Sequence, residues 1–591
     1  MRCALTIQMF ALSLIASCDP DGPRRSSYPA GPTVPSGGRF DAVRGVLGSM
    51  PRSLAVGRCD DDDALDVLSV GGDNSGLVIT PMKGPRPSMF FGRGDGTFVE
   101  REVPALPSRT YGAAIFIDID GDGRDDVVMA QDDVVMLRNA GGCRLEAPVT
   151  LAPSTGRHAL SLLATDVDLD GVLDLVVALS GPTNQPYRVL LGQGDGRFLE
   201  RPVSLAPLEA QEGGVSPFSA FFDDADGDGS RDLFALVDQA GGWFSWGSAS
   251  SDGYGRDDAV SVRFSAADPM GIAPLDFDRD GEIDYFVAGV RGHSLLLQGG
   301  GRALPDRAFE AEVEGVNDTY AWGTWAFDAD LDGSTDLLVL RIGEQASGGV
   351  AGPVELYLAR GDATFSEVGA RVVGQRLRAK AMACGDLSGR ADRACLVMTD
   401  GGPLLLRDGL TPRGRWAGLR LQGTVSAVDA TGARVSLLGA ERPQVYYYGA
   451  QAPFGASHER SLVVGIGARD TADFEVRWPS GIRQRLSTVA AGRYTTVVEP
   501  AAVTLSRRVA PADGRSEVEV IVDAAAAGAT TASLSARGPG SLSDEGADAS
   551  GRHRWRLIAP TAAGEAVLTV SLDGTALRVR PRVRFTSPQG S

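Results

Sequence analysis

Five segments of this chain share one spacing of Asp residues that suits a bound metal ion. The spacing D-x-D-x-D-G-x-x-D occurs at 118–126, 166–174, 224–232, 276–284 and 328–336. Calcium takes about six to eight oxygen ligands at roughly 2.3–2.6 Å, supplied by carboxylates and carbonyls. Acids at alternate positions of a tight loop can point inward together, and Gly at the sixth position permits a sharp turn. The spacing therefore predicts about five calcium ions, one in each loop.

In each loop we expect the Asp residues at positions one, three, five and nine to bind the ion, together with the backbone carbonyl of position seven. The predicted ligands are Asp118, Asp120, Asp122, Arg124 and Asp126; Asp166, Asp168, Asp170, Val172 and Asp174; Asp224, Asp226, Asp228, Ser230 and Asp232; Asp276, Asp278, Asp280, Glu282 and Asp284; and Asp328, Asp330, Asp332, Ser334 and Asp336.

These loops differ from EF-hands in two respects. An EF-hand needs a bidentate Glu at position twelve and a helix on each side. Position twelve is apolar here, as at Val177, and the flanks are short β-rich runs such as LDLVVAL at 173–179. The alternative is a solvated acidic turn without metal, which five copies in register disfavour.

Two degenerate copies of the loop stand at 58–66 and 384–392, where some of the acids are lost. We expect both to be turns without metal. Cys384 occupies the first metal position of the second copy, and Cys395 lies in the strand after it. A disulfide between them would take the place of the ion.

Two further cysteines of the chain also suggest a disulfide. Cys59 and Cys143 remain once Cys3 and Cys18 near the N-terminus are set aside, and an even number in an oxidising compartment favours disulfides. Zinc is the weaker alternative, because the spacing is unsuitable and the chain has 4 His.

The net charge excludes a large class of partners. The chain has 57 Lys and Arg against 76 Asp and Glu, which gives −19. The loop Asp residues account for this excess, and about five calcium ions would reduce it to about −9. Nucleic-acid binding requires a basic face, so we expect none.

The loops mark an internal repeat. The five loops and two degenerate copies begin at 58, 118, 166, 224, 276, 328 and 384. A period in this range indicates a propeller or solenoid. Each unit reads as four short strands, with the acidic loop between the first and second strands, which predicts seven blades. We expect a degenerate Gly-rich turn and fourth strand at 141–147, 250–264 and 300–313.

The seventh unit lacks a fourth strand of its own. The sequence GGRFDAV at 37–43 matches DGRFLER at 195–201, the fourth strand of the third unit. We therefore expect residues 39–44 to pair with 403–408, and Phe40 to occupy the place that Phe198 has in its own blade. This pairing would close the ring and remove an exposed sheet edge.

The N-terminus has the pattern of an export signal. Residues 1–17 are short, carry Arg2 and an apolar centre, and end in small residues before Cys18. This resembles a bacterial lipobox, which implies cleavage before Cys18 and a lipid anchor on it; the alternative is an ordinary signal peptide. Residues 18–37 are rich in Pro, Gly and Ser and read as a flexible tether.

The repeat resembles the FG-GAP or VCBS repeats of integrin-α-like propellers over residues 38–410. Residues 416–500 resemble the ASPIC/UnbV domain, which follows such propellers in cartilage acidic protein and in many bacterial secreted proteins. The blocks that carry this second resemblance are GARVSL at 432–437, LVVGIG at 462–467 and VRWPSG at 476–481. The family brings no established catalytic residue, and we expect Trp478 to be a packed strand end.

Residues 501–591 show short alternating strands separated by turns, as in an immunoglobulin-like sandwich. The run is similar to bacterial invasin-type domains. The expected fold is thus all-β: a seven-bladed propeller, a small β domain and a sandwich.

No catalytic motif stands out in the sequence, and the 4 His are scattered. We therefore expect a monomeric, calcium-stabilised binding or adhesion scaffold, exported and anchored by lipid, which binds a protein or glycan. The alternative is an enzyme acting on a polysaccharide or another polymer in the propeller funnel.

Overall fold

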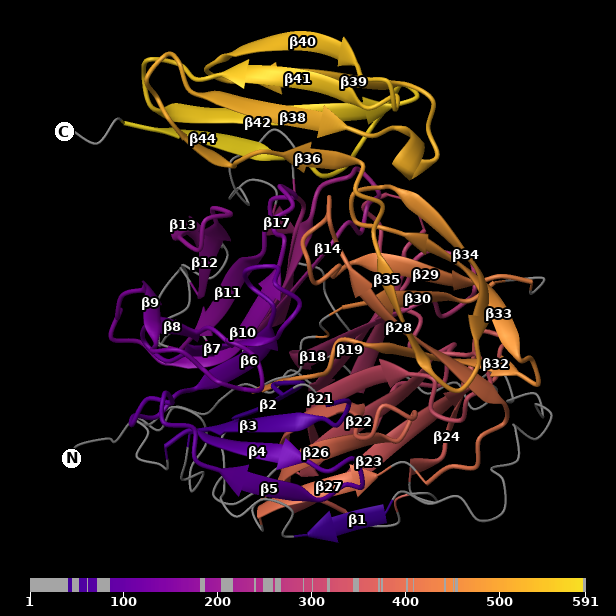
Figure 1. Ribbon diagram of the computed structural model, residues 1–591. Helices are drawn as coiled ribbons and strands as arrows, with labels where there is room; N and C mark the ends of the chain where they lie inside the picture. Colours follow the sequence, from indigo (N-terminus) through magenta and orange to yellow (C-terminus); the bar gives the residue numbers. More distant parts are fainter. Residues whose placement is uncertain are drawn as a thin grey trace, which may run out of the picture. The chain divides into compact units, whose positions relative to one another are not determined.

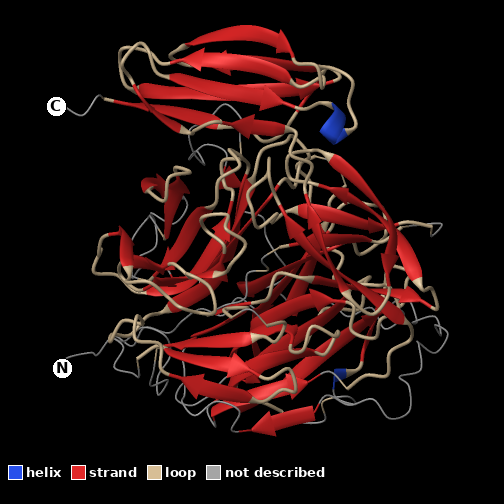
Figure 2. Ribbon diagram, viewed as in Figure 1, coloured by secondary structure: helices blue, strands red, loops and turns tan. Residues whose placement is uncertain are grey.

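The structure is a computed structural model. It describes residues 41–44, 53–60, 62–71, 86–180, 186–203, 216–238, 241–247, 259–260, 267–290, 292–299, 301–315, 319–343, 350–369, 373, 376–399, 402–407, 409–439, 443–449, 451 and 455–587. The regular structure is almost entirely β (Figure 2), and the 3-10 helix η3 spans Ala525–Ala527. This confirms the all-β class. The predicted signal peptide, Cys18, the tether and Phe40 lie outside the described residues.

Seven small sheets follow one another along the chain (Figure 1). The first four contain β2 (Ser53–Gly57), β3 (Asp66–Val70), β4 (Ser88–Gly92) and β5 (Phe98–Arg101); β6 (Ala113–Ile117), β7 (Asp126–Ala130), β8 (Val134–Leu137) and β9 (Val149–Ala152); β10 (Ala159–Thr165), β11 (Asp174–Leu179), β12 (Tyr187–Gly192) and β13 (Phe198–Val203); and β14 (Ser216–Asp223), β15 (Asp232–Asp238), β16 (Gly241–Ser245) and β17 (Ala259–Val260). The other three contain β18 (Ala267–Leu275), β19 (Asp284–Val290) and β20 (Gly292–Leu296); β21 (Thr319–Phe327), β22 (Asp336–Gly343), β23 (Val350–Ala359) and β24 (Phe365–Glu367); and β25 (Ala379–Asp386), β26 (Arg393–Thr399), β27 (Gly402–Arg407) and β1 (Asp41–Arg44).

The sheets form a closed ring. The first strand of each sheet contacts the first strand of the next, and β25 of the last sheet contacts β2 of the first. A hydrophobic core lies between each pair of neighbouring sheets, including the last and the first. Because both faces of a blade are covered, its central strands are buried throughout, as in β11.

The predicted ring closure is confirmed by the pairing of β1 with β27. The two strands are antiparallel, with Asp41 opposite Arg407 and Arg44 opposite Leu404. The N-terminal strand thus supplies the outer edge of the last sheet, as the sequence match with the third unit indicated.

Two of the predicted fourth strands were misplaced. In the second sheet the fourth strand is β9, and 139–145 form a bridged turn in which Gly141 and Gly142 have positive φ. The fifth sheet has three strands among the described residues, and its 301–313 segment contributes an isolated bridge between Leu296 and Asp306. Both segments contain the predicted turn, but their described residues do not contain the predicted fourth strand. In the fourth sheet β17 lies inside the predicted range.

Beyond the ring, the chain forms two further β units. The first has the sheets β32-β28-β35 and β30-β29-β33-β34, and the second has the sheets β36-β38-β41-β40 and β37-β44-β42-β39, with β43 beside β42. Their bounds are β28 (Arg415–Gln422), β29 (Ala433–Leu437), β30 (Val445–Tyr448), β31 (Ala456–Ser457), β32 (Leu462–Gly467), β33 (Thr471–Arg477), β34 (Arg483–Ala490), β35 (Tyr494–Val498), β36 (Val503–Leu505), β37 (Val509–Pro511), β38 (Glu517–Val522), β39 (Ala532–Arg537), β40 (Ser541–Ala547), β41 (His553–Ile558), β42 (Gly564–Leu572), β43 (Thr575–Ala576) and β44 (Arg582–Thr586).

The last unit is a two-sheet sandwich, since the strands of both sheets bury alternate residues. In β42 the residues from Ala566 to Leu572 alternate between buried and half-buried. One hydrophobic core runs through both C-terminal units and includes Trp478 and Trp555. The immunoglobulin-like character of the sandwich stays a prediction.

Candidate metal centres

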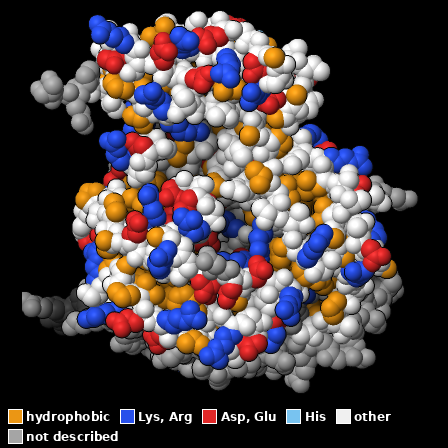
Figure 3. Space-filling view, viewed as in Figure 1, with side chains coloured by type: hydrophobic (Ala, Val, Ile, Leu, Met, Phe, Trp, Pro, Cys, Tyr) orange, Lys and Arg blue, Asp and Glu red, His pale blue; other side chains and the backbone are white. Residues whose placement is uncertain are grey.

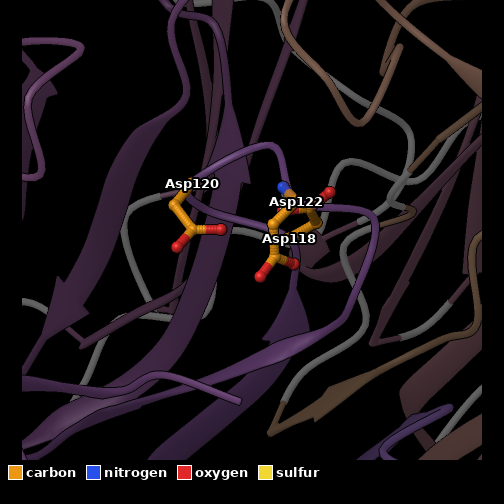
Figure 4. Close-up of side chains that lie close together, drawn as sticks. All are labelled: Asp118, Asp120 and Asp122. Carbon is orange, nitrogen blue, oxygen red and sulfur yellow. Dashed lines mark hydrogen bonds between the residues drawn. The ribbon is translucent and has the colours of Figure 1, made fainter. Parts of the chain in front are cut away.

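Each of the five intact loops brings three carboxylates together. In every group the candidate ligand atoms lie within 4.8 Å of one another. The groups are Asp118, Asp120 and Asp122; Asp166, Asp168 and Asp174; Asp224, Asp226 and Asp232; Asp276, Asp278 and Asp284; and Asp328, Asp330 and Asp332. Figure 4 shows the first group, on the loop between β6 and β7, where Asp118 and Asp122 lie side by side. Such a set of hard oxygen donors suits calcium.

The loop backbone holds these carboxylates in place. In the third sheet, the position-one residue Asp166 accepts hydrogen bonds from the N–H groups of Asp170 (3.0 Å) and Gly171 (2.8 Å). Gly171 has a φ of 83°, and Leu169 also lies in the left-handed region with a φ of 54°. The Gly at position six was predicted for this reason, whereas the positive φ at position four was not.

The Asp at position nine forms hydrogen bonds that the sequence did not reveal. Asp174 is 1% exposed, and it accepts hydrogen bonds from the N–H of Val167 in the loop (2.8 Å) and of Gly192 at the end of the third strand (2.7 Å). The same pair of bonds, at 2.7 to 3.2 Å, recurs at Asp66, Asp126, Asp232, Asp284 and Asp336. This residue therefore joins the loop to the blade in six sheets.

The two degenerate loops hold no group of three candidate ligands among their described residues. Cys384 and Cys395 form a disulfide between β25 and β26, and Cys59 is bonded to Cys143 of the second sheet. Cys384 and Cys395 lie opposite each other within β25 and β26, so the prediction that Cys384 stands at the first metal position was wrong. Asp386 at the end of β25 instead accepts hydrogen bonds from the loop N–H groups of Arg390, Ala391 and Asp392.

Burial raises the pKa of the loop carboxylates. It lifts the pKa of Asp166, Asp276 and Asp328 to about 7 and that of Asp232 and Asp284 to about 8, and neighbouring Asp residues add to the effect. Keeping several negative charges in so small a volume is unfavourable, and a divalent cation would stabilise the charged forms.

Several loops also meet arginines of the C-terminal segment. Arg413 lies 2.9 Å from Asp330 and 3.1 Å from Asp332, and Arg582 lies 3.1 Å from Asp168. Arg578 forms an ion pair with Asp224. Over the face shown in Figure 3, acidic and basic side chains are likewise interspersed.

The block LVVGIG touches a loop directly. The Gly465 N–H donates to the position-one carboxylate of Asp328 at 2.7 Å. A Cβ atom at Gly465 would come within 2.3 Å of the Leu331 carbonyl, so no larger residue fits without displacing the loop. In the preceding loop, at 276–284, Asp276 accepts a hydrogen bond from the Val445 N–H at 2.9 Å.

The other two blocks also have structural roles. Arg434 of GARVSL donates to the buried carboxylate of Asp223, at 2.8 and 2.6 Å. Trp478 of VRWPSG is 1% exposed and donates to Gln484 at 3.0 Å, which confirms that it is a packed side chain.

A segment of the first C-terminal unit lies against the innermost strands of the ring. β31 pairs in parallel with β2, at Leu54–Ala456 and Ala55–Ser457. His458 accepts a hydrogen bond from the Cys384 N–H (2.9 Å) and donates to the Thr324 carbonyl (2.9 Å), and burial lowers its pKa to about 4.

Residues near His458 in the sequence contact other blades of the ring. The Glu459 carboxylate pairs with Arg58 and accepts from the Asp386 N–H at 2.7 Å. Arg460 donates to the Phe116 carbonyl, and Gln451 forms two hydrogen bonds with the backbone of Ala326. Residues 451 and 456–460 therefore contact four of the seven innermost strands, at the centre of the ring.

The comparisons with known proteins agree with both sequence resemblances. The chain matches the ASPIC and UnbV family over residues 423–504 and the FG-GAP-like repeat over 59–129, 118–177 and 166–235. No curated protein matches it significantly. Among the described residues, no helix is long and apolar enough to cross a membrane.

Similar solved structures include three at low identity. An Agrocybe aegerita lectin that recognises non-reducing terminal N-acetylglucosamine is 16% identical, with 59% of this chain and 86% of that chain covered and a TM-score of 0.37. YCF48 bound to D1 peptide is 10% identical (65% and 99% covered, TM-score 0.37), and the Dos1 propeller is 11% identical (63% and 95% covered, TM-score 0.32).

Proposed function

The chain is an FG-GAP-repeat propeller protein with an ASPIC/UnbV domain, and on that premise we propose that it is a calcium-stabilised, non-catalytic binding scaffold outside the cytoplasm. The observation that carries this proposal is the set of five three-carboxylate groups at equivalent loops of consecutive sheets. The chemistry of these donors fits calcium, which would be held by the Asp side chains named above and would neutralise them.

The contacts of the loops support a structural task for calcium. Asp168, Asp224, Asp276, Asp328 and Asp330 all meet residues beyond position 410. Calcium at these loops would fix their conformation, and with it the surface on which the C-terminal units rest.

The centre of the ring favours binding over catalysis. An enzyme of the alternative class would need open space with convergent polar side chains at the ring axis. Residues 456–460 lie there, and the polar atoms of His458 and Glu459 are bonded to the backbone and to Arg58. The ligand, a protein or glycan, would then bind away from the ring axis.

Retention on glycan and protein arrays tests this function. The purified calcium-loaded protein should be retained by some surfaces and released by chelator, because the ligand-binding surface depends on the loops. It should release no sugar or peptide fragments from those surfaces. Fragment release that depends on this protein would show the alternative, an enzyme, to be right.

FG-GAP repeats occur in extracellular proteins, which fits export. We propose a lipid anchor at Cys18, because Ile15-Ala16-Ser17 precede it in the pattern of a lipobox. Mass spectrometry of the mature N-terminus should show a diacylglyceryl cysteine. A soluble product that begins at another residue would contradict the anchor.

A further inference from the structure

A cavity of about 230 Å³ lies where the propeller meets both C-terminal units. The propeller contributes Asp224 and Asp226 of the acidic loop at 224–232. The first C-terminal unit contributes Arg477 and Trp478, and the sandwich contributes Arg578. The volume lies just below the range of roughly 300–1,000 Å³ found for drug-sized ligands. It suits a ligand of about one sugar ring.

The wall of this cavity is rich in charge. Four of its side chains are arginines and four are acids: Arg231, Arg434, Arg477 and Arg578, and Asp223, Asp224, Asp226 and Glu282. Most of the arginines have a partner. Arg231 and Arg434 pair with Asp223, and Arg578 pairs with Asp224.

Arg477 at the end of β33 is the exception. Its half-buried side chain makes no hydrogen bond or ion pair within the part of the chain that the structure describes, and Glu282 lies beyond ion-pair distance. Burial lowers the pKa of Arg477, and repulsion from Arg578 lowers it further. An anion that binds beside such a guanidinium would stabilise its charged form through charge-assisted hydrogen bonds.

Two buried polar atoms of the wall also lack partners among the described residues. They are Arg231 Nε and Gln298 Oε1, and each of these two residues is 5% exposed. Buried polar groups are nearly always hydrogen-bonded, so such a pair indicates that water or a polar ligand completes the site. A donor and an acceptor together suit the hydroxyl groups of a sugar.

We propose that this cavity binds a carboxylate-bearing sugar residue, with Arg477 and Arg578 as the arginines that face its carboxylate. The proposal rests on the proposed function, since a calcium ion at Asp224, Asp226 and Asp232 would add two positive charges to a wall whose arginines and acids otherwise balance. That excess favours an anion over a neutral sugar. The residue is either a free sugar acid or the terminal unit of an acidic glycan.

Titration calorimetry of the purified full chain with sodium glucuronate tests the proposal, after calcium uptake has been measured in the same sample. Glucuronate should bind saturably, and glucose, its neutral counterpart, should not. Arg477→Gln should weaken glucuronate binding at least about tenfold, because a charge-assisted hydrogen bond is lost. Arg477→Lys should retain part of the affinity, since it keeps the charge but loses the planar fork.

Arg483→Gln is the matched control, because Arg483 lies on the neighbouring strand β34 and pairs with Glu475 at 2.9 Å. Arg483→Gln should bind glucuronate like the unmodified chain. All three variants should have the melting temperature of the unmodified chain. An oligosaccharide that ends in glucuronate distinguishes the two possible ligands. If it binds more tightly than free glucuronate, the natural ligand is the end of an acidic glycan, and if it does not bind, the natural ligand is the free sugar acid.

Three results would overturn the proposal. They are equal binding of glucose, equal or tighter binding of sulfate, and unchanged affinity in Arg477→Gln. Calcium uptake without any glucuronate binding would refute this inference alone, whereas absence of calcium uptake would refute the proposed function.

Discussion

Replacement of Glu459 by Ala should destabilise the protein by about 3–5 kcal/mol, which is the typical cost of leaving one partner of a buried ion pair without the other. The side chains of Arg58 and Glu459 are 16% and 3% exposed. Burial alone lowers the pKa of Arg58, yet the negative charge of Glu459, followed by those of Tyr494 and Asp386, raises it overall. The change would also remove the acceptor of the Asp386 N–H.

The effect should extend over the whole ring, because Arg58 belongs to the first sheet, Asp386 to the last, and Glu459 to the segment between them. A fall of melting temperature on the order of 5 °C or more is expected. Glu475→Ala is the control: its ion pair with Arg483 is exposed, so the change should cost less than about 1 kcal/mol. Equal melting temperatures of the two variants would mean that the central segment, residues 451 and 456–460, does not stabilise the ring.

Removal of calcium should have a still larger effect. A site held at a free calcium concentration of one hundred times its Kd stabilises the folded state by about 2.7 kcal/mol, and several independent sites would add. Chelation would also leave several carboxylates within 4.8 Å of one another in each loop, and their repulsion would loosen it. We expect the melting temperature to fall by more than about 10 °C in excess chelator.

Magnesium provides the control for this experiment. It requires a smaller, nearly octahedral site and keeps several waters, so it should restore little of the lost stability. A melting temperature that is the same with calcium and with chelator would contradict a stabilising role.

The sequence predicted the five loops and the ring closure, because both depend on short-range patterns that repeat. The Asp spacing defines a loop by itself, and Phe198 and Phe40 stand in matching segments. A single chain without repeats would not have revealed that the strand at 41–44 belongs to the last sheet.

The central segment and the arginine contacts could not be predicted in this way. His458 bonds to Thr324, and Arg582 lies beside Asp168, across separations of 134 and more than 400 residues. Contacts between residues so far apart in the sequence produce no local spacing pattern from which they could be predicted. The hydrogen bonds of Asp174 to two backbone N–H groups were missed for another reason. One acidic residue in a metal-like spacing looks the same whether it binds an ion, a backbone N–H, or both.

The measurement that tests the central claim most directly is the number of calcium ions bound per chain, determined by titration calorimetry of the unmodified protein and of Asp168→Ala. Asp168 belongs to a three-carboxylate group and is not the position-nine residue that joins the loop to the blade. The account predicts about five ions for the unmodified chain and about one fewer for the variant. No calcium uptake, or an unchanged number in Asp168→Ala, would contradict it.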